Sequence, residues 1–119
     1  YLWRGEMFRL LDGDARGILI ITREGPDLFE VKSLAVSPSY QRRGYGRTLL
    51  EFAASYCRSR GGRLLEVGTG ESPATLGFYE ACGFRRTRVV KNFFTDHYDH
   101  PIYDGGVLLR DMVYLRRML

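Results

Sequence analysis

A glycine-bearing turn between an expected strand and an expected helix carries the clearest chemical signal in the chain. Residues 34–46 read L-A-V-S-P-S-Y-Q-R-R-G-Y-G. The first backbone N–H groups of a helix have no intrahelical partner, so they attract anions. Gly44 and Gly46 let a ligand approach the backbone closely, and Arg42 and Arg43 add positive charge. The spacing predicts an anion cradle at residues 41–46 that suits a diphosphate, and a plain turn with an exposed arginine pair explains it equally well.

Other phosphate-binding loops fit this stretch less well. The sequence contains no G-x-x-x-x-G-K-[ST] motif, which excludes an ordinary P-loop. The dinucleotide pattern G-x-G-x-x-G is also missing, because Leu49 stands where its third glycine should be. Between residues 41 and 63 Glu51 is the only acid, and the net charge of the chain is +4. This local basic balance suits an anionic ligand.

The elements before the cradle read as an antiparallel meander of three strands. Alternating or apolar runs predict strands at residues 6–11, 17–23 and 29–36, separated by short turns. In the third strand, strict alternation places Phe29, Val31, Ser33 and Ala35 on one face.

The elements after the cradle alternate between helices and strands. Apolar positions at helical spacing (Leu49, Phe52, Ala53, Tyr56 and Cys57) predict a helix at residues 45–60, which two glycines then end. A strand at 63–67, a helix at 73–82 with Ser72 as its N-cap, and strands at 84–91 and 107–115 follow. Residues 92–106 are expected to form a long loop, and loops of this length are often functional. The order of elements predicts a mixed α/β sheet with a right-handed strand–helix–strand unit at its centre.

Several separated motifs resemble one family. The run Q-R-R-G-Y-G at residues 41–46 resembles the Q/R-x-x-G-x-G/A signature of the GNAT superfamily of N-acetyltransferases. Leu34, Ala35 and Val36, followed by Pro38, resemble the strand end that precedes that signature. The run F-Y-E-A-C-G-F at residues 78–84 resembles the family's L-Y-E-x-x-G-F helix end. The resemblance covers roughly residues 7–119, and the order of elements agrees with it.

The resemblance implies a fold and an activity. The fold would be a central, mostly antiparallel twisted sheet of about six strands, splayed at the cofactor site, with helices packed on it. One domain would cover residues 1–119 without the N-terminal acceptor helices of the family. The activity would be direct transfer of an acetyl group from acetyl-CoA to a primary amine of a small molecule or a protein, with no metal.

The resemblance also assigns the residues of the coenzyme site. The pyrophosphate would lie on the amides of residues 41–46, and the pantetheine arm would run along the strand end before them. A backbone N–H of that strand end would polarise the thioester carbonyl. The residues expected to bind acetyl-CoA are Leu34, Ala35, Val36, Gln41, Arg42, Arg43, Gly44, Tyr45, Gly46, Arg47, Ser72 and Phe78.

Two side chains are the expected catalytic groups. Tyr79 matches the family's tyrosine near the leaving sulfur, although an apolar helix stripe would also account for it. A thiol titrates near 8.5 and tyrosine near 10, so Tyr79 is expected to stabilise the thiolate by a hydrogen bond. The acceptor amine must lose a proton before it attacks, and Glu66 is the first candidate for the base, directly or through water. Glu30 is the second candidate, and a solvated strand-face glutamate is the simpler interpretation of it.

Two other functions remain open at this stage. Ser72 stands where many family members have asparagine, and the acceptor helices are missing, which favours a non-catalytic acyl-CoA-binding domain on the same fold. A nucleic-acid-binding module would use the basic stretch at residues 42–63 with exposed aromatic side chains, but Phe52 and Tyr56 are expected in the apolar stripe.

The expected loop after residue 91 has an unusual composition. Residues 95–104 hold both histidines of the chain, three aspartates and two tyrosines. The pairs Asp96–His97 and Asp99–His100 match no strong zinc motif. An acceptor-side loop whose acids attract a cationic amine is the preferred hypothesis, and an ordered or dimer-contact loop is the alternative.

Length and composition set the remaining limits. The chain has 119 residues, of which 45% are hydrophobic and 27% charged, as in a globular domain. Its longest apolar run, residues 18–21, is far too short to cross a bilayer, and no signal peptide is present. Cys57 and Cys82 are too few for a disulfide scaffold and read as buried small hydrophobes. We expect a cytoplasmic monomer or homodimer.

Overall fold

The computed structural model describes residues 5–12, 14–37 and 44–119, with only the backbone at residues 5, 7, 9–12 and 14–16. The chain divides into two compact units, and the division falls within strand β4 (Leu64–Gly70), after Glu66. Unit 1 comprises Tyr1–Glu66 and Met118–Leu119, and unit 2 comprises Val67–Arg117. The expectation of one domain over residues 1–119 stays a prediction.

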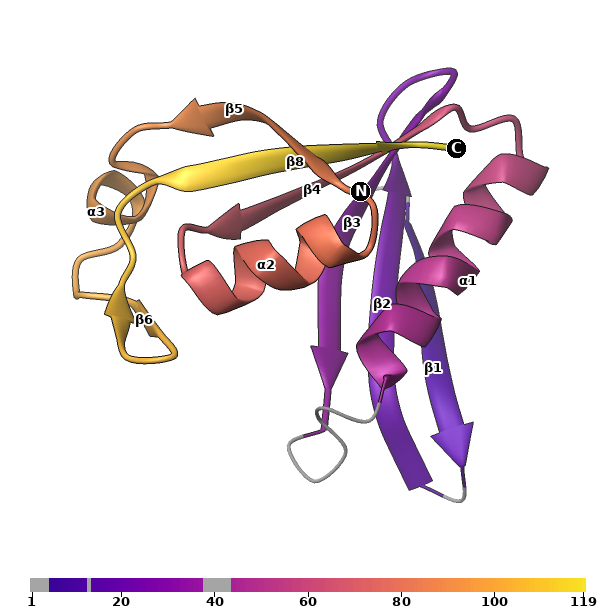
Figure 1. Cartoon of the computed structure of the whole chain (residues 1–119), viewed down its shortest axis with the longest axis horizontal. Coiled ribbons are helices and arrows are strands. Elements are labelled where there is room, and N and C mark those ends of the chain that lie inside the picture. The colour runs from indigo at the N-terminus through magenta and orange to yellow at the C-terminus, as the bar shows by residue number, and fades with distance from the viewer. Residues whose placement is uncertain (1–4, 13, 38–43) are drawn as a thin grey trace. The chain divides into compact units, whose positions relative to one another are not determined.

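Unit 1 is a meander of three strands covered by one helix. β1 (Gly5–Asp12), β2 (Asp14–Arg23) and β3 (Leu28–Val36) pair in antiparallel fashion, and β4 follows β3 in the strand order. Helix α1 (Tyr45–Ser59) packs on β2 and β3 (Figure 1). The apolar side chains between helix and sheet are buried: Leu19, Ile21, Phe29, Val31, Leu49, Leu50, Ala53, Ala54, Cys57 and Leu65. The three predicted strands and the helix are confirmed.

The predicted stripe of α1 is partly wrong. Phe52 is 44% exposed, whereas Leu50 and Ala54 are buried in its place. Phe52 and Tyr56 lie at the margin of the stripe and contact the Phe8 ring on β1, with ring centroids 4.7 and 4.8 Å from it. Because aromatic side chains are long, Phe52 and Tyr56 can contact β1 from the edge of the buried helix face.

A bulge in β3 overturns the predicted alternation of that strand. Ile21 pairs with Val31, but Ile20 pairs with Ser33, so Lys32 is an extra residue in the ladder. One extra residue exchanges the two faces of the strand beyond it. Phe29 and Val31 therefore share the buried face with Leu34, which pairs with the buried Leu19, and Ser33 and Ala35 are exposed.

Unit 2 holds the remainder of β4 and a second group of elements. These are α2 (Pro73–Ala81), β5 (Arg85–Val90), α3 (Phe93–His97), β6 (Tyr103–Asp104), β7 (Val107–Leu108) and β8 (Met112–Met118). The strand order continues from β4 to β8 to β5, with β5 and β8 antiparallel, and completes the order β1-β2-β3-β4-β8-β5. The buried apolar side chains are Val67, Leu76, Tyr79, Cys82, Phe84, Leu109, Val113 and Leu115.

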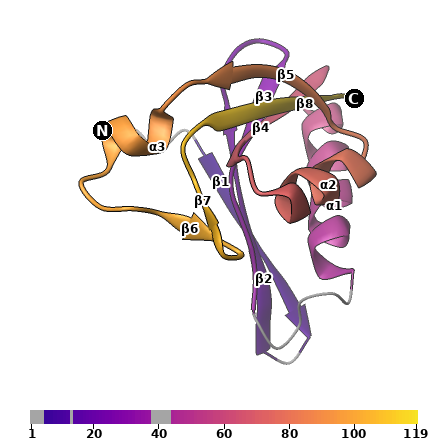
Figure 2. The same cartoon turned by 60° about the vertical axis from the view of Figure 1, so that its left-hand side comes forward.

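The segment between β5 and β8 differs from the expected loop. It contains the short helix α3 and a hairpin of β6 and β7 (Figure 2). The predicted strand at 107–115 is accordingly wrong: β7 ends at Leu108, and β8 begins at Met112. Gly105 and Gly106 both have positive φ (56° and 80°), which permits a two-residue turn between strands as short as these.

Both longer helices end in the same way. Gly61 follows α1 with φ of 83°, and Gly83 follows α2 with φ of 94°. After each glycine, the next N–H bonds back to a carbonyl five residues earlier: Gly62 to Cys57 at 2.8 Å, and Phe84 to Tyr79 at 3.1 Å. This Schellman arrangement satisfies carbonyls that a helix end leaves open. None of the described helices combines the length and apolarity needed to cross a membrane.

Candidate functional site

The N-terminus of α1 is open to an anion. Its N-cap residue, Gly44, has φ of 84°, makes no side-chain cap hydrogen bond and has no acidic residue in the turn after it. Thr48 donates its N–H and its hydroxyl to the Gly44 carbonyl, both at 3.0 Å, which fixes the start of the helix. Gly44 and Arg47 are exposed, and Tyr45 and Gly46 are half-buried. Gly44 has no side chain that could accept a hydrogen bond from the first turn, and the first N–H groups of a helix carry a partial positive charge.

Only part of the predicted coenzyme site can be placed. Gln41, Arg42 and Arg43 lie outside the described residues. Leu34, Ala35 and Val36 form the last residues of β3, next to β2 in the ladder, with Ala35 exposed. The strand end and the helix start therefore belong to the same unit, as the resemblance requires.

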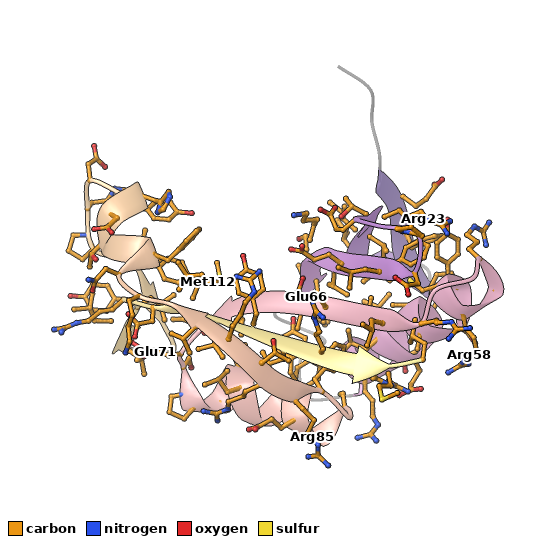
Figure 3. The ribbon with its side chains drawn as sticks, turned by 90° about the horizontal axis from the view of Figure 1, so that it is seen from above. Arg23, Arg58, Glu66, Glu71, Arg85 and Met112 are labelled. Atoms are coloured by element: carbon orange, nitrogen blue, oxygen red, sulfur yellow. The ribbon has the colours of Figure 1, made fainter. Side chains whose placement is uncertain are left out.

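Glu66 is a buried carboxylate on β4. It is 4% exposed and stands between Leu65 and Val67, which are equally shielded from solvent (Figure 3). Burying a charged side chain is costly, so such positions are often functional. Glu30, the second candidate, forms an ion pair with Lys32 at 3.2 Å, and its side chain is 15% exposed. The interpretation of Glu30 as a solvated strand-face glutamate is therefore wrong in one respect: its side chain is mostly shielded from solvent and paired with Lys32.

Tyr79 is a buried phenol on α2. It is 7% exposed, and its ring meets the rings of Phe78 and Phe84 edge-on at 5.2 and 5.6 Å. Burial, with a smaller contribution from Cys82, raises the pKa of Tyr79 to about 12. Its hydroxyl has no hydrogen-bond partner among the described residues. Tyr79 is therefore neutral at pH 7, and its hydroxyl can donate a hydrogen bond to a ligand.

The end of α2 holds Tyr79 in place. The Phe84 N–H bonds to the Tyr79 carbonyl, and the Gly83 N–H bonds to the Glu80 carbonyl, both at 3.1 Å. Phe84 is fully buried, so the aromatic contact anchors the tyrosine from the far side of the turn. The Arg86 guanidinium adds two contacts of 3.2 Å to the Glu80 carboxylate. This arrangement fixes the ring of Tyr79 through the main chain of the residues that follow it.

Ser72 is the N-cap residue of α2, as predicted, but without the side-chain hydrogen bond of a cap. The residue is 2% exposed. Pro73 at the first helical position already supplies the fixed φ of a helix start and has no N–H to satisfy. Ser72 therefore does not cap the helix with its hydroxyl. Phe78, also expected at the coenzyme, is half-buried beside Tyr79.

The two cysteines are unsuited to nucleophilic chemistry. Cys57 is fully buried in α1, and burial raises its pKa to about 11 against the opposing effect of Arg60 and Arg23. Cys82 is 4% exposed at the end of α2. Because the thiolate is the reactive form, a thiol with a raised pKa is inert at neutral pH.

The segment expected to engage the acceptor is ordered. His97 Nδ1 donates to the Phe93 carbonyl at 2.8 Å, and His100 Nδ1 lies 2.9 Å from the Asp99 carboxylate. Among the described residues there is no group of three or more potential metal ligands. Thr75 in the first turn of α2 donates to the Asp104 carboxylate on β6 at 2.9 Å. Sequence reasoning missed this hairpin, although the Asp-Gly-Gly run at 104–106 is a recognised hairpin signal.

Comparison with known proteins agrees with these features. The acetyltransferase (GNAT) family matches residues 4–84. The "Uncharacterized N-acetyltransferase YvbK" of Bacillus subtilis (strain 168) is 36% identical over 117 residues, which is 97% of this chain and 76% of that protein. A GNAT family acetyltransferase from Elizabethkingia anophelis, solved with acetyl-CoA bound, superposes with a TM-score of 0.91 at 30% identity, over 98% of this chain and 77% of that one.

A third relative has a named acceptor. The [Ribosomal protein bS18]-alanine N-acetyltransferase of Escherichia coli (strain K12) is 31% identical over 99 residues. The match spans 82% of this chain and 63% of that protein. The family match over most of the chain and the extent of these similarities establish that the chain belongs to the acetyltransferase (GNAT) family, with its mixed α/β fold, and is an N-acetyltransferase.

Proposed function

We propose that this chain moves the acetyl group of acetyl-CoA directly to a primary amine, with its residues in the roles that follow. The single observation that supports the coenzyme site best is the start of α1, where the N-cap residue Gly44 is exposed, lies in the left-handed region and has no side chain. The first-turn amides of Tyr45, Gly46 and Arg47 would bind the diphosphate, and Gln41, Arg42 and Arg43 would add to the same site. Acetyl-CoA supplies an acetyl group activated as a thioester.

Tyr79 would stabilise the leaving sulfur. As the amine nitrogen bonds to the carbonyl carbon, the carbon–sulfur bond breaks and the electron pair goes to sulfur. A coenzyme thiol titrates near 8.5 and Tyr79 near 12, so full proton transfer to the thiolate costs about 5 kcal/mol. Tyr79 therefore acts as a hydrogen-bond donor to the developing thiolate and keeps its proton. The second proton that the nitrogen loses as the amide forms neutralises the thiolate, while the first goes to the base.

Glu66 would accept the proton that the amine must lose. A primary ammonium has no lone pair, so a base must act before or during attack. Glu66 combines a carboxylate with nearly complete burial on β4. Burial raises the pKa of the Cys57 thiol and Cys82 is 4% exposed, which favours direct attack over an acyl-enzyme.

The acceptor would bind beside the segment at residues 92–106. This segment brings three aspartates into a chain of net charge +4, which favours a cationic amine. The similarity to the bS18-alanine N-acetyltransferase of E. coli adds a protein amine to the candidate acceptors.

A thermal-shift assay followed by an amine panel tests the function. Acetyl-CoA at 100 times its Kd should stabilise the chain by about 2.7 kcal/mol, or roughly 10 °C in Tm. CoA should act similarly and ATP should not. Binding without turnover of any amine would instead support a non-catalytic acyl-CoA-binding domain, and no shift with either coenzyme would contradict the proposed site.

The Glu66→Gln and Glu30→Gln pair tests the base. We expect Glu66→Gln to lower kcat about 10²- to 10⁴-fold, with partial recovery as rising pH deprotonates the amine itself. Glu30→Gln, the matched control on β3, should leave kcat unchanged. Equal effects of both substitutions would remove the assignment, and a Tm measurement on each variant separates a folding defect from a catalytic one.

A further inference from the structure

A pocket lies within the segment that joins β5 to β8, entirely inside unit 2. It is a depression of about 270 Å³, open to solvent, between α3 and the β6–β7 hairpin. Taking ~30 Å³ for each water, this volume equals about nine waters, which is enough for one phenyl or branched aliphatic group. The lining residues on which the argument rests are Phe94, Tyr98, Asp99, Ile102, Leu108 and Leu109.

The walls of this pocket are held in place by contacts within the segment. The Phe94 and Tyr98 rings stack with centroids 5.9 Å apart. The Leu109 N–H bonds to the Ile102 carbonyl, and the Phe94 N–H bonds to the Arg110 carbonyl, both at 2.8 Å. At the base of the segment, the Asn92 N–H bonds to the Asp111 carboxylate at 2.8 Å. The pocket therefore exists before any ligand arrives, which lowers the entropic cost of binding.

The pocket is apolar inside and acidic outside. Tyr98 is 45% and Leu108 is 37% exposed, so the segment leaves apolar surface open to a ligand. Residues 92–109 contain three aspartates and no lysine or arginine, within a chain of net charge +4. Asp99 lines the pocket, and its side chain is 99% exposed at the mouth. The Asp99 carboxylate lies 2.9 Å from Nδ1 of His100, which also lines the pocket. An open apolar pocket with a carboxylate at its mouth complements a ligand that joins a compact hydrophobic group to a cation.

The pocket is also tied to the helix that carries Tyr79. Thr75 donates to the Asp104 carboxylate at 2.9 Å, and this contact joins the first turn of α2 to the hairpin. Tyr79 lies one helical turn further along the same helix. The hairpin that lines the pocket is thereby joined to α2 through a direct hydrogen bond.

We propose that this pocket selects the acceptor: it takes the hydrophobic group of an amine whose ammonium lies beside Asp99. This inference rests on the proposed function. It defines the acceptors as primary amines that carry one compact apolar or aromatic group, and it disfavours polyamines and amino sugars, which have nothing to place in the cavity.

Two matched amines and two matched variants test the inference. Phenethylamine and ethanolamine share a two-carbon ammonium arm and differ in the phenyl or hydroxyl at its end. Calorimetry in the presence of saturating CoA measures binding, and acetylation assays measure kcat/KM. We expect phenethylamine to bind at least about 10-fold more tightly, because filling a hydrophobic pocket discriminates 10- to 200-fold.

Leu108→Gln should remove most of that preference and leave ethanolamine unchanged. Val89→Gln, at an apolar side chain of β5 that is 50% exposed and outside the pocket, should change neither amine. Asp99→Asn should weaken both amines by the same factor, roughly two- to fivefold.

The outcomes separate this inference from the proposed function. Equal binding of the two amines, no binding of either, or equal losses in Leu108→Gln would overturn the pocket assignment even if acetyl transfer occurs. A clear preference for phenethylamine in calorimetry, lost in Leu108→Gln but with no acetylation, would support the pocket and contradict the proposed function.

Discussion

Helices α1 and α2 end alike and begin differently. Each is followed by a glycine in the left-handed region and by an N–H that bonds back to a carbonyl five residues earlier. At their starts, Gly44 leaves α1 exposed and uncapped, whereas α2 begins at the buried Ser72 and at Pro73. The shared ends stabilise both helices in the same way. The different starts suit the helices to different roles, because of the two N-cap residues only Gly44 is exposed.

The difference indicates two ways of presenting chemistry. In α1 the functional groups are main-chain amides, so the conformation of one glycine matters more than the side chains around it. In α2 the functional group is the Tyr79 hydroxyl, set by packing at the helix end. A substitution that changes the backbone conformation should therefore impair ligand binding at α1. At α2, removal of the Tyr79 hydroxyl oxygen alone should impair catalysis.

Among substitutions in and around the two helices, the largest effect should come from Tyr79→Phe. A hydrogen bond to a charged group is worth about 1.5–3 kcal/mol, so kcat should fall about 10- to 100-fold with little change in coenzyme affinity. Because burial raises the pKa of Tyr79 to about 12, the phenol keeps its proton throughout pH 6–10. The ratio of wild-type to variant kcat should therefore be constant over that range. Equal losses in kcat and in coenzyme affinity would sink the assigned role.

The next effect should come from Gly44→Val. The left-handed conformation costs non-glycine residues about 1–2 kcal/mol, so the start of α1 should shift and the Kd for CoA should rise about 10-fold. Among the residues that the structure describes, no atom lies within 4 Å of a Cβ added at Gly44, so the expected cause is the backbone conformation. Gly44→Asn is the control, since asparagine tolerates this conformation, and calorimetry with CoA measures both. Equal losses in the two variants would contradict the argument.

A matched pair, Gly61→Ala and Gly83→Ala, should have smaller effects. Both residues have positive φ, and neither has an atom within 3.4 Å of a built Cβ, so each substitution should cost about 1 kcal/mol of stability. Only Gly83→Ala should also lower kcat, by a few-fold, because Gly83 belongs to the turn that holds Tyr79. Denaturant titration and steady-state kinetics on both variants test the contrast, which a similar kcat loss in Gly61→Ala would abolish.

The smallest effect should come from Gly77→Ala, which should be stabilising. Gly77 is exposed in the middle of α2, and a Cβ there would meet no atom within 4 Å. Alanine should raise stability by about 0.5–1 kcal/mol through its helix propensity. Thermal unfolding measures the gain, and a loss of stability would show that α2 does not have the geometry described.

Most of the elements could be predicted from the sequence because local patterns determine them. Apolar periodicity gave β1 to β3, α1, β4 and α2, and the glycines after each helix marked where they end. The segment between β5 and β8 was predicted to be a loop, but it contains α3 and the β6–β7 hairpin. Strands of two residues are too short to show an alternation of apolar and polar side chains. Their pairing depends on a two-glycine turn and on contacts such as Thr75 to Asp104, which are distant in sequence.

The sequence alone determined the residue types available for chemistry: the glycines and arginines of the cradle, Glu66, Tyr79 and the acids after residue 91. It did so because main-chain anion binding and helix punctuation depend on local residue identity. Only the tertiary structure decided that a bulge at Lys32 exchanges the faces of β3, that Ser72 does not cap α2, and that an apolar pocket forms behind Asp99. These features depend on how strands and turns that are distant in sequence pack together. Local sequence patterns do not specify which distant residues will be in contact.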